Sequence, residues 1–495
     1  MANRDDDTTA GPAADGASGF GRRFLLGTMQ LSAGGWVVSI INLAIGVALT
    51  RILGPEAFGL FAFVFAINEL INIIGAFSIG SALIQSRHES QSLYDSALAI
   101  SAALGLAGMA IAFCGAFVLY VYRGPQEAWF LIVLGGARIL VLLSQIPRAK
   151  LERSLRYGTV TTLSIVESSI PNLAALGLAY IGFGAWALVW REVLIGGLMF
   201  ALESGASGYR FRGKIERISS QQLMRFAKPM FFAHGIAVVV ERADRIAIGA
   251  FMGNAAAGLI DRGRFIAEMG RVVIRPVERS SFNLFSRLQE DYDRLSRSFS
   301  LVSYFLIRVM FASSVVLALT PVESVRLIYG EEWLAAAPIL KWLAIYAALV
   351  PMFGMIRVLV IAQDKVPRIA LISGLQAGLL IPATIAAGYY DSLQGAAIAV
   401  VVVAGLGVIL GGAAIRDLVT VSYRRLLAAP LAASVGTVFL ICALDYQGWL
   451  DPVTWYLRPF LVGIMFCTLL LALDRSDLIR ELQYLRAQMS SRREP

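Results

Sequence analysis

Two short stretches, 199 residues apart, share the pattern that decides how this chain folds. The first is RILGPEAFGL at residues 51–60, and the second is AFMGNAAAGL at residues 250–259. The same offset aligns Gly54 with Gly253, Gly59 with Gly258, Leu60 with Leu259 and Glu69 with Glu268. The chain therefore contains an internal repeat, with one copy in each half.

The composition around this repeat is that of a membrane protein. Hydrophobic residues make up 57% of the chain and charged residues 16%, whereas globular proteins average about 45–50% and about 25%. Apolar stretches of roughly 20 residues, enough to cross a hydrocarbon core of about 30 Å, recur from Phe24 to Asp474. We predict an all-α integral membrane protein of about 14 transmembrane helices. The expected spans are 24–49, 58–85, 95–121, 128–146, 158–180, 183–203, 226–252, 258–286, 299–320, 334–361, 369–388, 394–415, 427–445 and 454–473.

The basic residues of the connecting loops predict the orientation. If the N-terminus is inside, the inner loops and tails hold 27 Lys and Arg residues, whereas the outer loops hold only Arg51, Arg123 and Arg326. Cytoplasmic loops of membrane proteins carry such an excess of positive charge. Both termini are therefore predicted to be cytoplasmic.

The repeat and the spans together predict the organisation of the chain. Copies that lie six helices apart keep the same orientation, so an axis along the membrane normal should relate them. The expected parts are a cytoplasmic tail (1–22), an N-terminal six-helix lobe (23–203), a basic cytoplasmic linker (204–225), a C-terminal six-helix lobe (226–415), two further helices (416–474) and a cytoplasmic tail (475–495).

The span 258–286 is the most highly charged of the fourteen. Dropping it would place the following basic loops outside, so we retain it as a transmembrane helix. Its charged residues have spacings of four, three, four and four, which place them on one helical face; they are Arg264, Glu268, Arg271, Arg275 and Arg279. We predict that this face lines a water-filled cavity and binds an anion. The alternatives are an interfacial amphipathic helix or internally paired charges.

Other intramembrane charges are candidates for the same cavity. Arg138 and Lys341 would add to its cationic wall. Ionisable groups within spans are costly and usually face a bundle interior or a cavity. The candidates for ion coupling or for charge pairing are Glu69, Glu167, Glu241, Asp244, Arg245 and Glu268.

Several functional classes lack their motifs in this sequence. No GxxxxGK[ST] loop for nucleotide phosphates is present, and the three cysteines fall within apolar runs. We therefore predict no catalytic residue, metal site, cofactor or nucleic-acid partner. Outer loops of about a dozen residues or fewer also argue against a membrane glycosyltransferase or polymerase, which remains the third hypothesis.

Three segments carry a resemblance to a known family. They are LTRILGPEAFGLFAFVFAINELINIIGAFSIGSALIQ (49–85), MRFAKPMFFAHGIAVVVERADRIAIGAFMGNAAAGL (224–259) and SFNLFSRLQEDYDRLSRSF (281–299). They resemble the polysaccharide transporter family, the Wzx-type oligosaccharide flippases, which belongs to the multidrug/oligosaccharidyl-lipid/polysaccharide flippase superfamily.

The resemblance implies two six-helix lobes in a V, an alternating-access cycle and an inner-membrane location. It implies undecaprenyl-pyrophosphate-linked oligosaccharide as cargo, for O-antigen, capsule or exopolysaccharide synthesis. The other implied partners are membrane lipids and the polysaccharide polymerase and export machinery. Arginines suit the pyrophosphate of such a cargo, because the guanidinium presents a planar fork of donors. The second hypothesis is a drug or lipid II exporter of the same superfamily.

Overall fold

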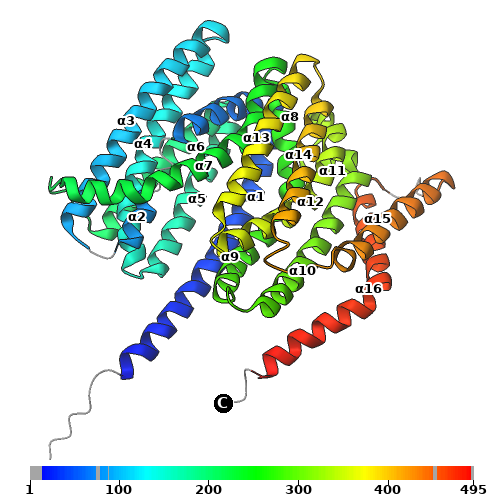
Figure 1. Cartoon of the computed structure of the whole chain (residues 1–495). Helices are drawn as coiled ribbons and strands as arrows, with labels where there is room; N and C mark the ends of the chain where they lie inside the picture. The colour runs from blue at the N-terminus through cyan, green and yellow to red at the C-terminus, as the bar shows by residue number, and fades with distance from the viewer. Residues whose placement is uncertain (1–13, 74–78, 87–88, 450–453, 492–495) are drawn as a thin grey trace, which may run out of the picture.

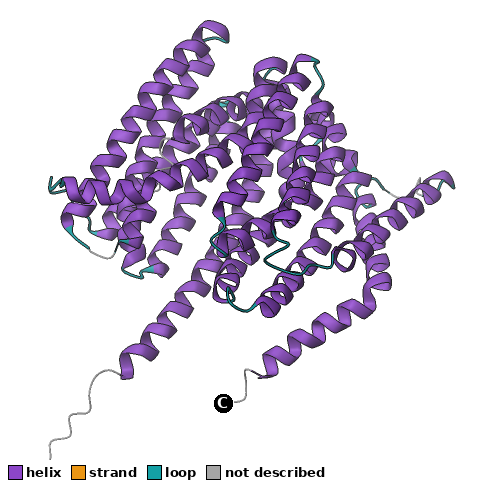
Figure 2. Ribbon diagram, in the orientation of Figure 1, coloured by secondary structure: helices purple, strands orange, loops and turns teal. Residues whose placement is uncertain are grey.

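The computed structural model describes residues 14–73, 79–86, 89–449 and 454–491, and those ranges contain helices but no strand (Figure 2). The helices of the first half are α1 (Ala14–Ile71), α2 (Ile79–Gln85), α3 (Gln91–Tyr122), α4 (Pro125–Arg153), α5 (Tyr157–Tyr180) and α6 (Trp186–Ser207). Those of the second half are α7 (Arg217–Met252), α8 (Asn254–Glu268), α9 (Arg271–Arg287), α10 (Tyr292–Leu319), α11 (Pro321–Ile328), the 3₁₀ helix η2 (Glu331–Ala336), α12 (Ala337–Ala362), α13 (Val366–Tyr389) and α14 (Leu393–Ala414). Two helices follow, α15 (Tyr423–Tyr446) and α16 (Arg458–Ser491).

Ten helical segments within the described ranges are long and apolar enough to cross a membrane. The predicted all-α membrane fold is therefore confirmed, whereas the count of fourteen spans stays a prediction. The helices α6, α7, α8 and α9 are not among the ten. They carry many of the intramembrane charges that the sequence displays.

The helices pack in two groups that α1 brings together (Figure 1). In the first half, α4 packs on α3 and α6, and α5 packs on α1 and α6. In the second half, α12 packs on α10 and α14, and α13 packs on α7 and α14. The helix α1 also contacts α7 and α8, while α15 and α16 pack on each other and on α10. The division into lobes at the predicted boundaries remains a prediction.

Both copies of the repeat have a helix interruption at the equivalent glycine, with a similar backbone conformation. Gly54 interrupts α1 with φ 67° and ψ 173°, and Gly253 separates α7 from α8 with φ 89° and ψ 179°. Residues other than glycine rarely adopt this backbone conformation, because its φ is positive. The break leaves nearby carbonyls without helical partners. Trp333 donates its indole N–H to the Thr50 carbonyl at 3.0 Å, and Arg123 donates to the Gly249 carbonyl, which is the repeat equivalent of Thr50.

The same repeat produces a reciprocal contact between α1 and α8. A Cβ atom on Gly59 would lie 1.7 Å from the carbonyl oxygen of Asn254, and a Cβ on Gly258 would lie 2.4 Å from that of Pro55. Pro55 and Asn254 are themselves equivalent in the repeat. Each copy therefore packs a glycine against the first residue after the break in the other copy, and only hydrogen fits at either position.

One predicted span and one predicted loop differ from the structure. The span 258–286 is not one helix, because α8 ends at Glu268 and α9 begins at Arg271. Gly270 lies in this break, where an added Cβ would be 2.5 Å from the sulfur of Met310. The predicted loop between spans 24–49 and 58–85 is also absent as a loop, because α1 bends at the single residue Gly54 and continues to Ile71.

Candidate functional site

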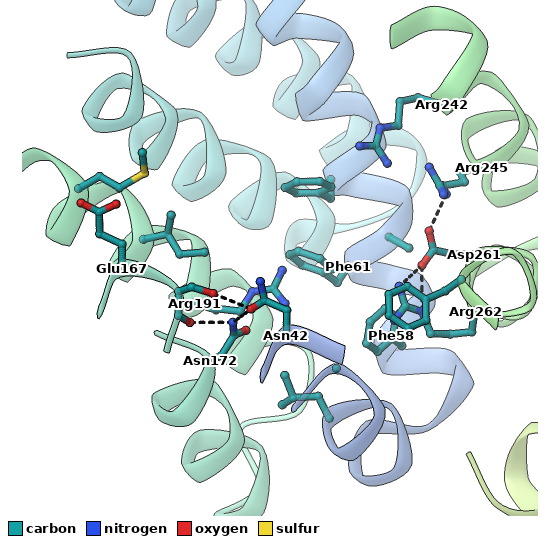
Figure 3. A pocket seen from close by; sticks show the side chains of 18 of the residues that line it. Asn42, Phe58, Phe61, Glu167, Asn172, Arg191, Arg242, Arg245, Asp261 and Arg262 are labelled. Atoms are coloured by element: carbon teal, nitrogen blue, oxygen red, sulfur yellow. Dashed lines mark hydrogen bonds and ion pairs between the residues drawn. The ribbon is translucent and has the colours of Figure 1, made fainter. Parts of the chain in front are cut away.

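A cavity of about 510 Å³ lies among α1, α5, α6, α7 and α8 (Figure 3). Polar and charged side chains from all five helices line it, and they are Asn42, Ser164, Glu167, Ser168, Asn172, Arg191, Arg242, Arg245, Asp261 and Arg262. The apolar part of the lining is Gly46, Leu49, Phe58, Phe61, Ala62, Phe65, Ile195, Met199 and Phe265. We call this space the central cavity.

Aromatic rings on α1 form one wall of the central cavity. Phe58, Phe61 and Phe65 are spaced by three and four residues, which places them on one face of the helix. Phe61 and Phe65 stack with their ring centroids 5.2 Å apart.

Arginines from other helices lie over these rings. The guanidinium carbon of Arg262 is 4.1 Å from the Phe58 centroid and 4.6 Å from that of Phe265. Arg191 lies 5.7 Å from the ring of Phe61. Such cation–π contacts orient the guanidinium groups while leaving N–H donors at their edges.

On the side formed by α7 and α8, one carboxylate holds two arginines. Arg245 and Arg262 both form ion pairs with Asp261. The Asp261 carboxylate is largely buried, at 11% side-chain exposure, so the pairs are only partly hydrated. Asp261 thus fixes two cations at the cavity wall.

On the α5 side, Glu167 is joined by a group of neutral hydrogen-bonding side chains. The Asn42 side-chain oxygen accepts from the Ser168 hydroxyl at 2.7 Å and from the Asn172 amide at 2.6 Å. Figure 3 shows Asn42, Asn172 and Arg191 grouped apart from Arg245, Asp261 and Arg262. The central cavity therefore offers amides, hydroxyls and Arg191 in one group and the two arginines paired with Asp261 in the other.

The charges of the lining residues do not cancel. Arg191, Arg242, Arg245 and Arg262 face the cavity, against the two carboxylates of Glu167 and Asp261. Arg191 is also paired with Glu192 at 2.6 Å, and Arg242 lies 3.8 Å from Glu69. The excess of guanidinium groups suits an anionic group, and the rings and amides suit a polar ligand with apolar faces.

Only some of the residues predicted from the sequence reach this cavity. Glu167 and Arg245 line it. Glu69 of α1 lies 3.8 Å from Arg242 and 3.8 Å from Arg138, so these three residues form one charge group.

The predicted arginine face instead belongs to a separate network. Arg264 pairs with Asp244, and its Nε lies 3.2 Å from Glu268. Glu268 also pairs with Arg271 at 3.0 Å and accepts from the hydroxyl of Tyr346 at 3.1 Å. We call Asp244, Arg264, Glu268, Arg271 and Tyr346 the α8 charge network. None of its members lines the central cavity.

The remaining predicted residues are placed elsewhere. Arg275 on α9 and Lys341 on α12 are exposed, and neither lines the central cavity. The side chains of Glu241 and Arg279 lie outside the described part of the structure.

Sequence reasoning missed most of the cavity lining. Arg191, Asp261 and Arg262 were not selected, and neither were the phenylalanines of α1. The spacing of Phe58, Phe61 and Phe65, together with the i, i+3 spacing of Arg242 and Arg245, was the signal available in the sequence.

The fold and the cavity define a class, a multi-pass helical membrane protein of the transporter type. The model of the polysaccharide biosynthesis protein family matches residues 48–338, more than half of the chain. The chain therefore belongs to that family.

Two curated relatives and two solved structures agree with this assignment. The succinoglycan biosynthesis transport protein ExoT of Rhizobium meliloti (strain 1021) is 26% identical over 313 residues, 60% of this chain and 60% of the relative, so the match spans less than two thirds of that relative. The lipopolysaccharide biosynthesis protein WzxC of Escherichia coli (strain K12) is 21% identical over 403 residues, 79% of this chain and 81% of the relative.

The solved structures show likeness of fold alone. The lipid II flippase MurJ in an inward closed conformation has a TM-score of 0.71 at 14% identity, covering 91% of this chain and 100% of that one. An inward-facing multidrug resistance MATE family transporter of the MOP superfamily has a TM-score of 0.61 at 14% identity, covering 77% of this chain and 95% of that one. The chain thus has the fold of the flippase superfamily suggested by its sequence.

Proposed function

We propose that this protein moves undecaprenyl-pyrophosphate-linked oligosaccharide across the inner membrane by alternating access, supplying O-antigen, capsule or exopolysaccharide synthesis. The observation that carries the proposal is the central cavity, where four arginines outnumber two carboxylates beside an aromatic wall. The names of the two curated relatives, which concern succinoglycan transport and lipopolysaccharide biosynthesis, support the same cargo class.

The chemistry of such a cargo matches the two sides of the cavity. A pyrophosphate is anionic and accepts several hydrogen bonds, and arginine is suited to it because of its planar fork of donors. The rings of Phe58 and Phe61 offer packing surfaces for the apolar faces of a sugar, and the Asn42–Ser168–Asn172 group offers partners for hydroxyls. We expect the pyrophosphate to bind near Arg191 and Arg262.

The repeat contact provides a place for the cavity to close. Gly59 and Gly258 bring α1 and α8 together directly beside Phe58 and close to Asp261, two residues of the cavity lining. We propose that this contact parts when the cavity opens to the opposite side of the membrane. Both termini would be cytoplasmic, as the loop charges predict.

A binding measurement tests the proposed cargo. Purified protein is titrated with an undecaprenyl-pyrophosphate-linked oligosaccharide and with the same glycan on undecaprenol that lacks the pyrophosphate, and the shift in melting temperature reports binding. We expect Arg262→Gln to weaken binding of the pyrophosphate form by about tenfold or more, since one charge-assisted hydrogen bond is worth about 1.5–3 kcal/mol.

The matched control is Arg480→Gln, because Arg480 is 62% exposed at its side chain and lies on α16, away from the cavity. Its affinity should equal that of the wild type. Equal binding of the two lipids by the wild-type protein would refute a pyrophosphate site, and tighter binding of lipid II than of either would favour the exporter hypothesis.

A further inference from the structure

Three carboxylates surround one arginine at the junction of α4, α5 and α6. Arg148 on α4 places Nη1 2.8 Å from Glu203 of α6 and 3.6 Å from Glu167 of α5. Its Nε lies 3.2 Å from Glu152, one turn along α4, and its Nη2 donates to the Ser164 hydroxyl at 3.2 Å. We call Glu167, Arg148 and Glu203 the carboxylate pair cluster.

The two carboxylates on neighbouring helices are deeply buried. The side chain of Glu203 is 1% exposed and that of Glu167 is 6% exposed, whereas Arg148 and Glu152 are 30% and 31% exposed. The second oxygens of the pair, Oε1 of Glu167 and Oε2 of Glu203, are buried and have no hydrogen-bond partner among the described residues. Two buried acceptor oxygens at this site therefore lack a hydrogen-bond donor.

Charge counting shows what is missing at this site. If both carboxylates were ionised, Arg148 would neutralise only one of them, even before Glu152 is counted. An uncompensated buried charge is expensive, and two carboxylates that share a site do not both ionise at low cost. One proton would remove the excess charge and would supply the missing O–H donor.

Two other buried carboxylates, Glu481 and Asp474, are compensated differently. Glu481 on α16 is 3% exposed at its side chain, and it has two arginine partners, Arg297 at 2.8 Å and Arg425 at 2.5 Å. Asp474 is held by Arg308 and by the hydroxyl of Tyr304. The carboxylate pair cluster therefore has one arginine for two buried glutamates, whereas the equally buried Glu481 has two arginines to itself.

We propose that the carboxylate pair cluster binds one proton, shared between Glu167 and Glu203, and exchanges it with water in the central cavity through Glu167. Glu167 lines that cavity, whereas Glu203 does not, so Glu167 is the entry point and Glu203 the inner acceptor. Arg148 contacts both and holds the site together. If the cavity faces the two sides of the membrane in turn, this proton lets transport respond to a proton gradient. The coupling role rests on the proposed transport function, whereas proton binding does not.

The proton site is tested first without any cargo. N,N′-dicyclohexylcarbodiimide reacts with protonated carboxyl groups in apolar surroundings, and peptide mass spectrometry locates the adduct in the full-length protein in detergent. We expect labelling of Glu203 or Glu167 near neutral pH, lost as the pH is raised. Glu481 is the internal control, because it is equally buried and doubly paired, and it should stay unlabelled.

Two results of the labelling would overturn the proposal. Absence of label on both Glu167 and Glu203 between about pH 6 and pH 9, a range above the ordinary glutamate pKa of about 4.3, would mean that no proton is held. Protection of the pair by Na⁺ at constant pH would assign the site to a metal cation instead.

A transport measurement then tests the coupling. In proteoliposomes with an imposed pH gradient, Glu203→Gln should lose the gradient-dependent change in rate while binding cargo within about twofold of the wild type. Glu203→Asp, which retains an ionisable group, should keep part of the response. A full gradient response by Glu203→Gln would exclude coupling at this site.

The two proposals fail in distinguishable ways. A labelled pair in a wild-type protein that moves no lipid-linked oligosaccharide would refute the proposed function and leave the proton site standing. Transport by a wild-type protein whose pair takes no label would refute the proton site alone. The labelling uses the wild-type chain, so a variant that fails to fold does not prevent either conclusion.

Discussion

Arg264 shows how a charge inside a membrane protein can be structural. Its side chain is 9% exposed, it pairs with Asp244, and it donates to the hydroxyl of Tyr346 at 3.1 Å. Removing one partner of a buried pair typically costs about 3–5 kcal/mol, because the other charge is left uncompensated. The side chain of Asp244 is 1% exposed, so it would be such a charge.

We therefore predict that Arg264→Gln lowers the melting temperature and the membrane abundance of the protein. The double variant Arg264→Gln with Asp244→Asn should recover much of both, since no unpaired charge remains. Thermal unfolding of the detergent-purified variants measures the effect. Normal stability of Arg264→Gln with a specific loss of cargo binding would instead support the cavity-wall role predicted from the sequence.

The sequence predicted the charged character of this region but not the roles of its residues. A helical projection placed Arg264, Arg271 and Arg275 on one face because it assumed one straight helix across 258–286. In the structure Arg264 and Arg271 both pair with Glu268, whereas Arg275 is exposed. Asp244 of α7 is among the candidates for charge pairing that the sequence predicts, whereas Tyr346 of α12 is not, because periodicity within one segment carries no information about neighbours so distant in sequence.

At the scale of elements, the repeat predicts where α1 and α8 meet. Gly59 and Gly258 are equivalent in the repeat, and each packs against the backbone of the other copy with no room for a Cβ. We predict that Gly258→Ala forces the helices apart and costs about 1–3 kcal/mol of stability, as overpacking generally does. Transport should fall as well, if this contact closes the cavity.

The matched control for this substitution is Gly177→Ala on α5, because nothing lies within 4 Å of the added Cβ there. Its melting temperature should equal or exceed that of the wild type. Equal behaviour of the two alanine variants would show that the α1–α8 contact is not tightly closed in the membrane.

A second contact between elements depends on pH. Asp417, after α14, pairs with Arg368 at 2.6 Å and with Lys365 at 2.9 Å near the start of α13. Their hydrogen bonds hold the pKa of Asp417 below its ordinary value. A depressed carboxyl pKa adds stability above about pH 4, and this contribution disappears as the pH falls through the folded-state value.

Because the Asp417 side chain is 50% exposed, the contribution should be small. We predict that Asp417→Asn slightly lowers the melting temperature at neutral pH and that the difference from the wild type vanishes in strong acid. Unfolding followed by circular dichroism at several pH values measures this. A difference that grows on acidification would contradict the assignment.

Much of the element order could be predicted, because span length and hydropathy follow directly from the thickness of the bilayer. The repeat aligned Gly54 with Gly253, and the structure shows that both have a positive φ. The exact breaks within charged segments could not be predicted. Gly270 lies between α8 and α9 and close to Met310 of α10, a neighbour that no local pattern reveals.

At the scale of the whole molecule, α15 offers a test of orientation. Ser422 precedes this helix and Gln447 follows it, and both are exposed. The start of α1 and the end of α16 lie on one side of the molecule (Figure 1). The loop charges predict that this side faces the cytoplasm.

We predict that a cysteine at Gln447 reacts with a membrane-impermeant thiol reagent in intact spheroplasts, whereas one at Ser422 reacts only after lysis. The background requires replacement of the three exposed native cysteines, Cys114, Cys442 and Cys467. The opposite labelling pattern would reverse the orientation and place the termini outside.

Transport of a lipid-linked oligosaccharide through the central cavity is tested most directly by reconstitution. Proteoliposomes carry a fluorescent undecaprenyl-pyrophosphate-linked oligosaccharide, and an impermeant quencher reports how much glycan stays outside. We predict that the wild-type protein and Arg480→Gln equilibrate the glycan between leaflets. The rate for Arg262→Gln should be lower by about tenfold or more. Folded wild-type protein that leaves the glycan in its original leaflet, or an Arg262→Gln variant as fast as the wild type, would contradict transport through this cavity.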